Sequence, residues 1–451
     1  MYIPRLLTML FFSPNRRYLT GMDWMVRALD HASKRETGVG NVSQVVLELK
    51  GRLDEGAFRE RARRFVAVNP VVGGVTRRAW HVAPYWSIPE VAAPENSRVR
   101  VVDLPVEGGV TAVFDELARI VNEPFAHARH HLAFSLITQG SKSFVALRFD
   151  HRLLDARGAE MVLMALHRFT GDGVPVSGTP AHLSHWLRKF TAGKHVNRTF
   201  LSLRGEEPSA ALSPLRRAAQ EIRPAEYRFS HYSPQASQRV ADAADDRAGF
   251  LMMTPYLLGC ATHVFNTVFE KKNRSGDYVV SVNVDGRAAA GAEDQVFFNH
   301  VSFLFFKFLR QEAGDLPRLW TSASRQWLEN ARRKRSADFA EMSMLTRILP
   351  VSILNRVMRI LCHGAEASFA FSYIAESGYQ DTAFMGLEVD NVHHMPRVPP
   401  APGVGLFFTS FHGRLNVVLS SLAGLLTATE RADIMKRLDA VLRDVGDDRG
   451  S

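Results

Sequence analysis

Residues 143–170, SFVALRFDHRLLDARGAEMVLMALHRFT, change from one hydrophobic period to another within a short loop. Apolar residues alternate over 143–149, as in a strand, and recur at helical spacing from residue 159. Between the two periods, His151 and Asp155 stand four residues apart. Loops held by two rigid elements often carry catalytic groups. A neutral imidazole here, with an ordinary pKa of about 6.5, has the properties of a general base.

The same spacing also has a purely structural interpretation. Asp155 comes shortly before the helical run, and aspartate is a favoured N-cap residue. His151 would then be a surface histidine after a strand. Spacing alone favours this structural interpretation.

The motif His151-x-x-x-Asp155, about one third of the way along the chain, resembles the motif of the CoA-dependent acyltransferase superfamily. Its members include chloramphenicol acetyltransferases, nonribosomal peptide condensation domains, plant BAHD acyltransferases, and bacterial wax ester synthases and polyketide-associated acyltransferases. The resemblance implies an α/β fold of two chloramphenicol-acetyltransferase-like lobes. Each lobe is expected to be a mixed sheet with flanking helices, and the active-site channel is expected at the seam.

Other segments resemble the same families in chain order. The stretch LKGRLDEGAFRERARRFVAVNP, residues 49–70, is similar to the first segment of condensation domains and wax ester synthases. The sequence pattern predicts further elements: helices at 22–32, 111–121 and 254–269, a helix after the capping box at 427–430, strands at 41–50, 98–102, 132–138, 278–284 and 301–308, and a hairpin at 403–420. Residues 370–378, AFSYIAESG, resemble a strand end of the wax ester synthases. We expect an N-terminal lobe at 1–175, a basic crossing segment at 176–230 and a C-terminal lobe at 231–451.

The resemblance also implies roles for single residues. His151 is the expected general base. Asp155 is expected not to touch substrate but to pair with Arg287 and hold the loop in place. The residues expected to contact substrate are Gly158, Asn299, Ser372 and Tyr373.

Four positions depart from the family pattern. Asp150 stands where many members have a second histidine, and Tyr373 stands where the wax ester synthases have asparagine. Ala156 and Phe298 each replace a usual glycine. Because glycine permits unusual backbone angles and close approaches, either the turn at Ala156 differs or Gly158 supplies the flexibility.

The charge of the chain favours anionic partners. Its 451 residues carry a net charge of +10 and are 46% hydrophobic, enough for a large core. CoA, an acidic carrier protein, anionic lipid and nucleic acid all fit this charge. The crossing segment contains basic residues that would guide a pantetheine carrier or form a solvated face: Arg188, Lys189, Lys194, Arg198, Arg204, Arg216 and Arg217.

Other site classes find little support. Neither His127, His130 and His131 nor the pair His393 and His394 has the accompanying ligands of a zinc site, so we expect no metal. The basic run 332–335 lacks interleaved aromatic residues, which argues against nucleic acid.

Cysteine usage and hydropathy indicate the compartment and the character of the N-terminus. Cys260 and Cys362 are far apart, which indicates no disulfide framework and a cytoplasmic setting. The apolar run at 6–12 is too short to span a membrane. Membrane contact through Leu6, Leu7, Phe11 and Phe12 is less favoured than their burial.

The resemblance implies an acyltransferase with His151 as base. It would move an acyl group from a thioester to a hydroxyl or amine of a small-molecule acceptor. The co-substrate would be acyl-CoA or an acyl-phosphopantetheine carrier, an acyl or peptidyl carrier protein would be a partner, and no cofactor would stay bound. The alternatives are a freestanding condensation enzyme that forms an amide between carrier-bound groups, and a noncatalytic member that binds a carrier or lipid.

Overall fold

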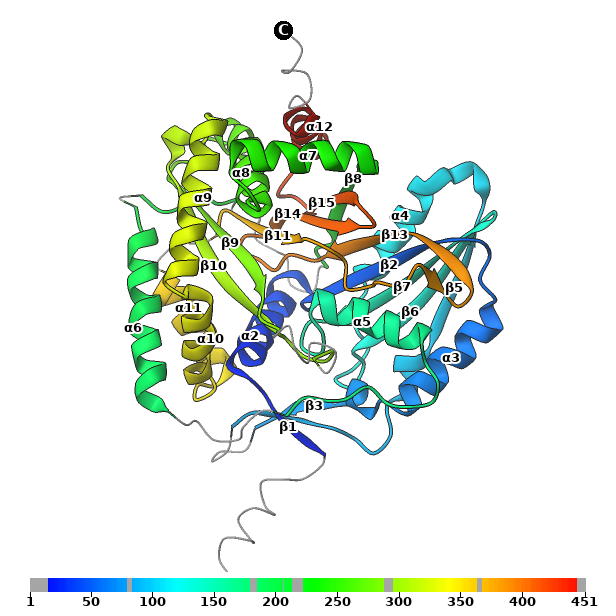
Figure 1. Ribbon diagram of the computed structural model, residues 1–451. Coiled ribbons are helices and arrows are strands. Elements are labelled where there is room, and N and C mark those ends of the chain that lie inside the picture. The colour runs from blue at the N-terminus through cyan, green and yellow to red at the C-terminus, as the bar shows by residue number, and fades with distance from the viewer. Residues whose placement is uncertain are drawn as a thin grey trace, which may run out of the picture.

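Two six-stranded mixed sheets meet at a seam, and helices flank both of them (Figure 1). The computed structural model describes residues 15–78, 83–178, 185–205, 207–212, 222–287, 295–362 and 367–443. The apolar run at 6–12, the residues Arg216 and Arg217, and the side chain of Cys362 lie outside this description. The predicted fold class, two lobes each built on a mixed sheet, is confirmed.

The first sheet has the strand order β12-β13-β2-β7-β6-β5. Its strands are β12 (Ala383–Phe384), β13 (Leu387–Pro396), β2 (Val42–Lys50), β7 (Lys142–Asp150), β6 (Leu132–Gln139) and β5 (Val99–Leu104). Helices α3 (Glu55–Ala67) and α5 (Ala156–His167) share a core with Val145, Leu147 and Phe149. Helix α4 (Gly109–Val121) packs on the other face against Phe144 and Ala146, so both faces of β7 are buried.

The second sheet has the strand order β10-β9-β11-β14-β15-β8. Its strands are β10 (Val301–Phe308), β9 (Tyr278–Asp285), β11 (Phe369–Ile374), β14 (Val404–Phe411), β15 (Arg414–Leu422) and β8 (Ala225–His231). One face shares a core with α7 (Pro234–Arg247), α8 (Met253–Lys271), α9 (Leu316–Arg332) and α12 (Ala428–Arg443).

A group of four helices lies beside the seam, where α10 packs against α2, α6 and β10, and α11 packs against α2. These helices are α2 (Gly21–Thr37), α6 (Trp186–Leu203), α10 (Arg335–Thr346) and α11 (Val351–Cys362). A small third sheet contains β1 (Arg16–Tyr18), β4 (Tyr85–Ser87) and β3 (Val75–Arg77). None of the described helices is both long and apolar enough to cross a bilayer.

Strand β13 crosses from the later half of the chain into the first sheet. It pairs antiparallel with β2 from Glu388 opposite Lys50 to Pro396 opposite Ser43, with a register shift between Val389 and Asn391. Strand β8, conversely, comes from the predicted crossing segment and forms an edge of the second sheet. The proposed limits 1–175, 176–230 and 231–451 stay a prediction, and residues 383–396 are built into the sheet of the N-terminal half.

The stretch that leads to His151 folds as its periodicity predicts. Strands β6 and β7 form an antiparallel hairpin in which Gln139 pairs with Lys142. Helix α5 begins at Ala156, three residues earlier than its hydrophobic period indicated, because Asp155 caps it. His151 therefore lies in a turn of only a few residues between a central strand and a capped helix.

Candidate active site

Backbone hydrogen bonds fix the turn that carries His151. The His151 N–H donates to the carbonyl of Asn41 at 3.0 Å, which ties the turn to the start of β2. The side-chain amide of Asn299 donates to the His151 carbonyl at 2.7 Å. Asn299 is itself held, since its N–H donates to Asp23 on α2 at 3.0 Å. Three segments distant in sequence thus position one imidazole.

The His151 ring lines a cavity and contacts a hydroxyl. Its Nε2 lies 2.9 Å from Oγ of Ser43, which is on the neighbouring strand β2. Phe149 packs against the ring edge-to-face at 5.2 Å between centroids. Burial lowers the pKa of His151 below its usual value, and the carboxylates of Asp155 and Asp150 offset this only in part. The imidazole is therefore neutral at pH 7, as a general base must be.

Asp155 both caps the helix and forms an ion pair. Its Oδ1 accepts from the Gly158 N–H and from Nη2 of Arg287, each at 2.8 Å, and its Oδ2 accepts from the His300 N–H at 2.9 Å. The pair with Arg287 is the contact expected from the sequence, and its two side chains are only 3% and 4% exposed. The capping and ion-pair interpretations of this residue are thus both present in the structure.

Arg287 is held on three sides. Its Nε donates to the Gln295 carbonyl at 3.0 Å, and its Nη1 pairs with Asp285 at 3.1 Å. Burial opposes its charge, but the carboxylates of Asp155 and Asp285 outweigh this effect and raise the pKa of Arg287. The guanidinium therefore joins the turn of the first lobe to the end of β9 in the second.

Gly158 has a packing role. A Cβ at this position would lie 2.3 Å from the carbonyl oxygen of Val296, so a side chain would push α5 away from the loop that carries Asn299. Gly158 faces this loop, whereas Asp155, Ala156 and Arg157 line the cavity. Ala156 is the first residue of α5 and needs no left-handed backbone angle. Ala156 therefore fits this turn with an ordinary helical backbone, and Gly158 is needed for the close approach to Val296 and not for flexibility.

Phe298 adopts the backbone conformation that its family glycine would favour. Its φ is +75°, a conformation that costs a bulky residue on the order of 1–3 kcal/mol. Three contacts hold it there: its N–H donates to the Leu153 carbonyl at 2.5 Å, Trp86 packs against its ring at 5.7 Å, and the Arg17 guanidinium lies 3.6 Å above the ring. The strained residue is therefore the neighbour of Asn299, and the three contacts of Phe298 fix the path of this loop.

Asp150, which replaces the second histidine of many family members, anchors a buried charge network. Arg152 Nε donates to both Asp150 oxygens, at 3.0 and 2.8 Å, and lies 3.5 Å from Asp30 on α2. Burial opposes ionisation of Asp150, but Arg152 and His131 hold its pKa well below the usual range. A histidine at position 150 could not pair with Arg152, so the departure at 150 fits the arginine two residues later.

A large cavity lies between the two sheets. Its volume is about 1010 Å³, and its lining includes Ser43 on β2, His151 in the turn after β7, and Ser372 and Tyr373 on β11. Asn299 also lines it. Burial raises the pKa of Tyr373, so its hydroxyl stays protonated and able to donate. Of the four residues expected to contact substrate, Asn299, Ser372 and Tyr373 thus border the cavity.

Three histidines that were considered as metal ligands, His131, His393 and His394, contact carbonyl or carboxylate oxygens. His131 Nε2 lies 2.8 Å from the Gly74 carbonyl, and His394 Nε2 lies 2.8 Å from buried Glu160. His393 lies 3.2 Å from Glu48. Within the described part of the chain, no three His, Cys, Asp or Glu side chains converge as metal ligands would.

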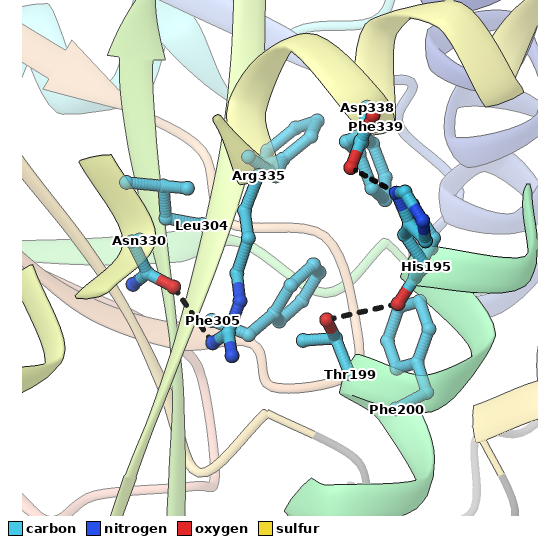
Figure 2. A pocket seen from close by; sticks show the side chains of 11 residues that line it. His195, Thr199, Phe200, Leu304, Phe305, Asn330, Arg335, Asp338 and Phe339 are labelled. Atoms are coloured by element: carbon cyan, nitrogen blue, oxygen red, sulfur yellow. Dashed lines mark hydrogen bonds and ion pairs between the residues drawn. The ribbon is translucent and has the colours of Figure 1, made fainter. Parts of the chain in front are cut away.

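A second cavity, of only about 20 Å³, lies between α6, α10 and β10 (Figure 2). His195 on its rim pairs with Asp338 at 2.8 Å, and Arg335 donates to Asn330 at 2.8 Å. On α6, Arg188 and Lys189 both pair with Glu341. Two residues of the predicted basic surface therefore form ion pairs that hold α6 against α10.

His130 is expected to make the fold sensitive to mild acid. Burial beside Arg148 lowers its pKa to about 4, against about 6.5 in an unfolded chain. Its contribution to the free energy of unfolding is thus complete above pH 6.5 and is lost as the pH falls toward 4. The loss should be on the order of 1–3 kcal/mol. Urea unfolding from pH 7 to 4 should show this loss, and His130→Gln should reduce it. If the exposed neighbour His127→Gln reduced it equally, His130 would not be the cause.

Comparison with known proteins gives structural matches only. No family model and no curated protein matches the sequence. The first condensation domain of the calcium-dependent antibiotic synthetase, solved with a substrate analogue, matches with a TM-score of 0.69 and 16% identity over 96% of both chains. The chain therefore shares the fold of this condensation domain.

Two further structures with this fold come from different proteins. A trichothecene 15-O-acetyltransferase from Fusarium sporotrichioides matches with a TM-score of 0.67 and 10% identity, over 95% of both chains. The starter condensation domain of rhizomide synthetase matches with a TM-score of 0.64 and 12% identity, over 99% of this chain and 96% of that one. Condensation domains and an O-acetyltransferase therefore share this architecture.

Two residues at the site, Ser43 and Asp23, were not predicted from the sequence. Ser43 lies in a strand of ordinary composition, and its contact with His151 depends on the pairing in which Ser43 stands opposite Phe149. Asp23 supports Asn299 but reads in sequence only as an acidic residue in the first turn of a helix. The Thr20–Asp23 capping box was a detectable signal for it.

Proposed function

We propose that the protein is an acyltransferase that moves an acyl group from a thioester to a hydroxyl or amine acceptor, with His151 as general base. The observation that carries this proposal is the neutral imidazole in the cavity, whose Nε2 already holds a hydroxyl at 2.9 Å. The acceptor atom attacks the thioester carbonyl while Nε2 takes its proton. The carbon–sulfur bond then breaks, and the same proton passes to the departing thiolate.

The surrounding residues position the base and do not react. Asp155 and Arg287 hold the start of α5, and Asn299 holds the His151 carbonyl, so the ring keeps its direction as charge develops. The donor in this proposal is acyl-CoA or an acyl-phosphopantetheine carrier. The net charge of +10 favours either anionic donor.

Amide formation is a second candidate. The rhizomide synthetase structure of the same fold holds C8-CoA and Leu-SNAC, an acyl donor and an amino acid thioester. A carrier-bound amine in the place of the acceptor would make the present protein a condensation enzyme. The base and its support would be the same, and only the acceptor would differ.

The proposal is tested by thioester consumption. Purified protein is incubated with a panel of acyl-CoA and acyl-carrier donors and with hydroxyl or amine acceptors, and products are identified by mass. Ester products support O-acyl transfer, and amides from carrier-bound amines support condensation. A folded protein that binds donors but consumes none over a broad panel would instead be a noncatalytic binding member.

Ser43→Ala is expected to keep turnover within about tenfold of the wild type. Direct attack needs only His151 and the acceptor, and Ser43 occupies the acceptor position before substrate enters. The mass of the protein after incubation with donor alone should stay unchanged. Loss of turnover in Ser43→Ala together with an acylated wild-type protein would instead make Ser43 a nucleophile.

A further inference from the structure

One side of the large cavity is apolar. We call it the apolar arm, and it is lined by Met25, Leu29, Phe303, Phe305, Leu354 and Met358. The polar neighbour Asn355 has its side-chain amide 3.3 Å from the His31 ring. Away from β10 the same sheet becomes more polar, since Asn283 and Ser281 on β9 pair with Phe303 and Phe305, and Ser372 lies on the next strand, β11. The apolar part of the cavity therefore lies between the β10 edge of the sheet and the helices α2 and α11.

The apolar arm leads away from His151. Strand β10 begins two residues after Asn299, whose amide lies 2.7 Å from the His151 carbonyl. Val301, Phe303 and Phe305 then line the cavity on one face of the strand. Four residues of strand span roughly 13 Å, so Phe305 lies about 13 Å from Val301 at the start of β10. The arm is thus long as well as apolar.

Aromatic rings close the far end. The Phe305 ring lies 5.0 Å from that of Phe200 on α6 and 5.9 Å from that of Phe339 on α10. These three residues line both the large cavity and the small one, and Figure 2 shows them gathered around the latter. They therefore form a partition that sets the depth of the arm.

We propose that the apolar arm binds an unbranched aliphatic chain of about eight to twelve carbons, whose extended length of about 10–14 Å matches this depth. The inference rests on the proposed function for its reactive end, which would lie at His151. The chain belongs either to the acyl group of the donor or to an alkyl group of the acceptor. An acyl chain and an alkyl chain would make the same apolar contacts in the arm.

Binding is measured first, without any reaction. Saturated free fatty acids and 1-alkanols of four to sixteen carbons are titrated calorimetrically into the wild-type protein. Affinity should rise about three- to fourfold per methylene and stop rising near ten to twelve carbons, because each buried methylene adds the same transfer free energy until the partition is reached. Affinity that does not depend on chain length would overturn the inference.

Turnover then identifies the source of the chain. One series varies the acyl-CoA chain with a fixed short acceptor, and the other varies the alkanol or alkylamine with acetyl-CoA. If kcat/KM rises with the chain length of the donor, the acyl group occupies the apolar arm. If it rises with the chain length of the acceptor, the alkyl group does. Binding that depends on chain length, without thioester consumption, would reject the acyltransferase proposal and support chain binding in the arm. Turnover that is independent of chain length in both series would reject chain binding in the arm and support the acyltransferase proposal.

Two variants test the depth of the arm directly. Phe305→Ala opens the partition and should move the preferred length up by about two to three carbons, since one ring is removed. Met358→Trp fills the arm and should shorten the preferred length. Thr409→Val, on the β14 side of the same cavity, is the matched control and should leave the preference unchanged. Thermal unfolding checks that each variant folds, and folded variants with unshifted preferences would contradict the proposal.

Discussion

Replacing His151 by alanine is expected to lower turnover about 10²- to 10⁴-fold, the usual contribution of a general base. The imidazole acts mainly in the transition state, where it takes the acceptor proton, so the affinity for the thioester donor should hardly change. The pKa of His151 is already lowered by burial. The acid limb of the wild-type rate profile should therefore lie below pH 6.5, and the variant should lack it.

The measurement compares thioester consumption by wild type and variant at saturating donor. His127→Ala is a suitable control, because this histidine is exposed and contacts Glu95 at 3.5 Å and the Arg129 N–H at 3.3 Å. The control should keep full turnover. Equal turnover in His151→Ala and wild type would exclude His151 as the base, while leaving the fold and the cavity as described.

Asp155→Asn is expected to lower the free energy of unfolding by about 3 kcal/mol, near the lower end of the range for breaking a buried ion pair. Asparagine is an equally good N-cap, so the substitution keeps the cap of α5 and removes the charge that faces Arg287. Arg287 would retain Asp285, which limits the loss. Turnover should fall as well, because the turn with His151 loses its fixed position.

Urea unfolding of Asp285→Asn provides the comparison. The Asp285 side chain is 32% exposed, against 3% for Asp155, so its pair with Arg287 should contribute less than about 1 kcal/mol. Equal losses in the two variants would contradict a special role for Asp155. A double substitution of Asp155 and Arg287 should cost less than the sum of the single ones, since neither then leaves an unpaired buried charge.

The sequence allowed the strand, the turn and the helix around His151 to be predicted because each has a strong local signal. Alternating residues at 143–149, the cap at Asp155 and the helical run from 159 act over short distances. The lobes and the partnership of Asp155 with Arg287 came from the family resemblance instead. The pair itself is present at 2.8 Å, although the two residues are 132 positions apart.

Contacts set by strand register could not be predicted in this way. Ser43 meets His151 only because β2 and β7 pair with Ser43 opposite Phe149. A shift by one residue would turn Ser43 to the other face. The left-handed angle at Phe298 has no signal in the residue itself and was indicated only by the glycine of the resembling families, because tertiary contacts impose the angle on a residue that disfavours it. Such contacts depend on the assembled fold.

The crossing of β13 into the first sheet has a consequence for synthesis on the ribosome. Strand β2 emerges early, but its partner at residues 387–396 follows more than three hundred residues later. Until then one edge of β2 has unpaired backbone groups, and exposed strand edges invite pairing with other chains. A nascent chain that stops before Leu387 would therefore keep an open, aggregation-prone edge. The first lobe can finish folding only when most of the second has been made.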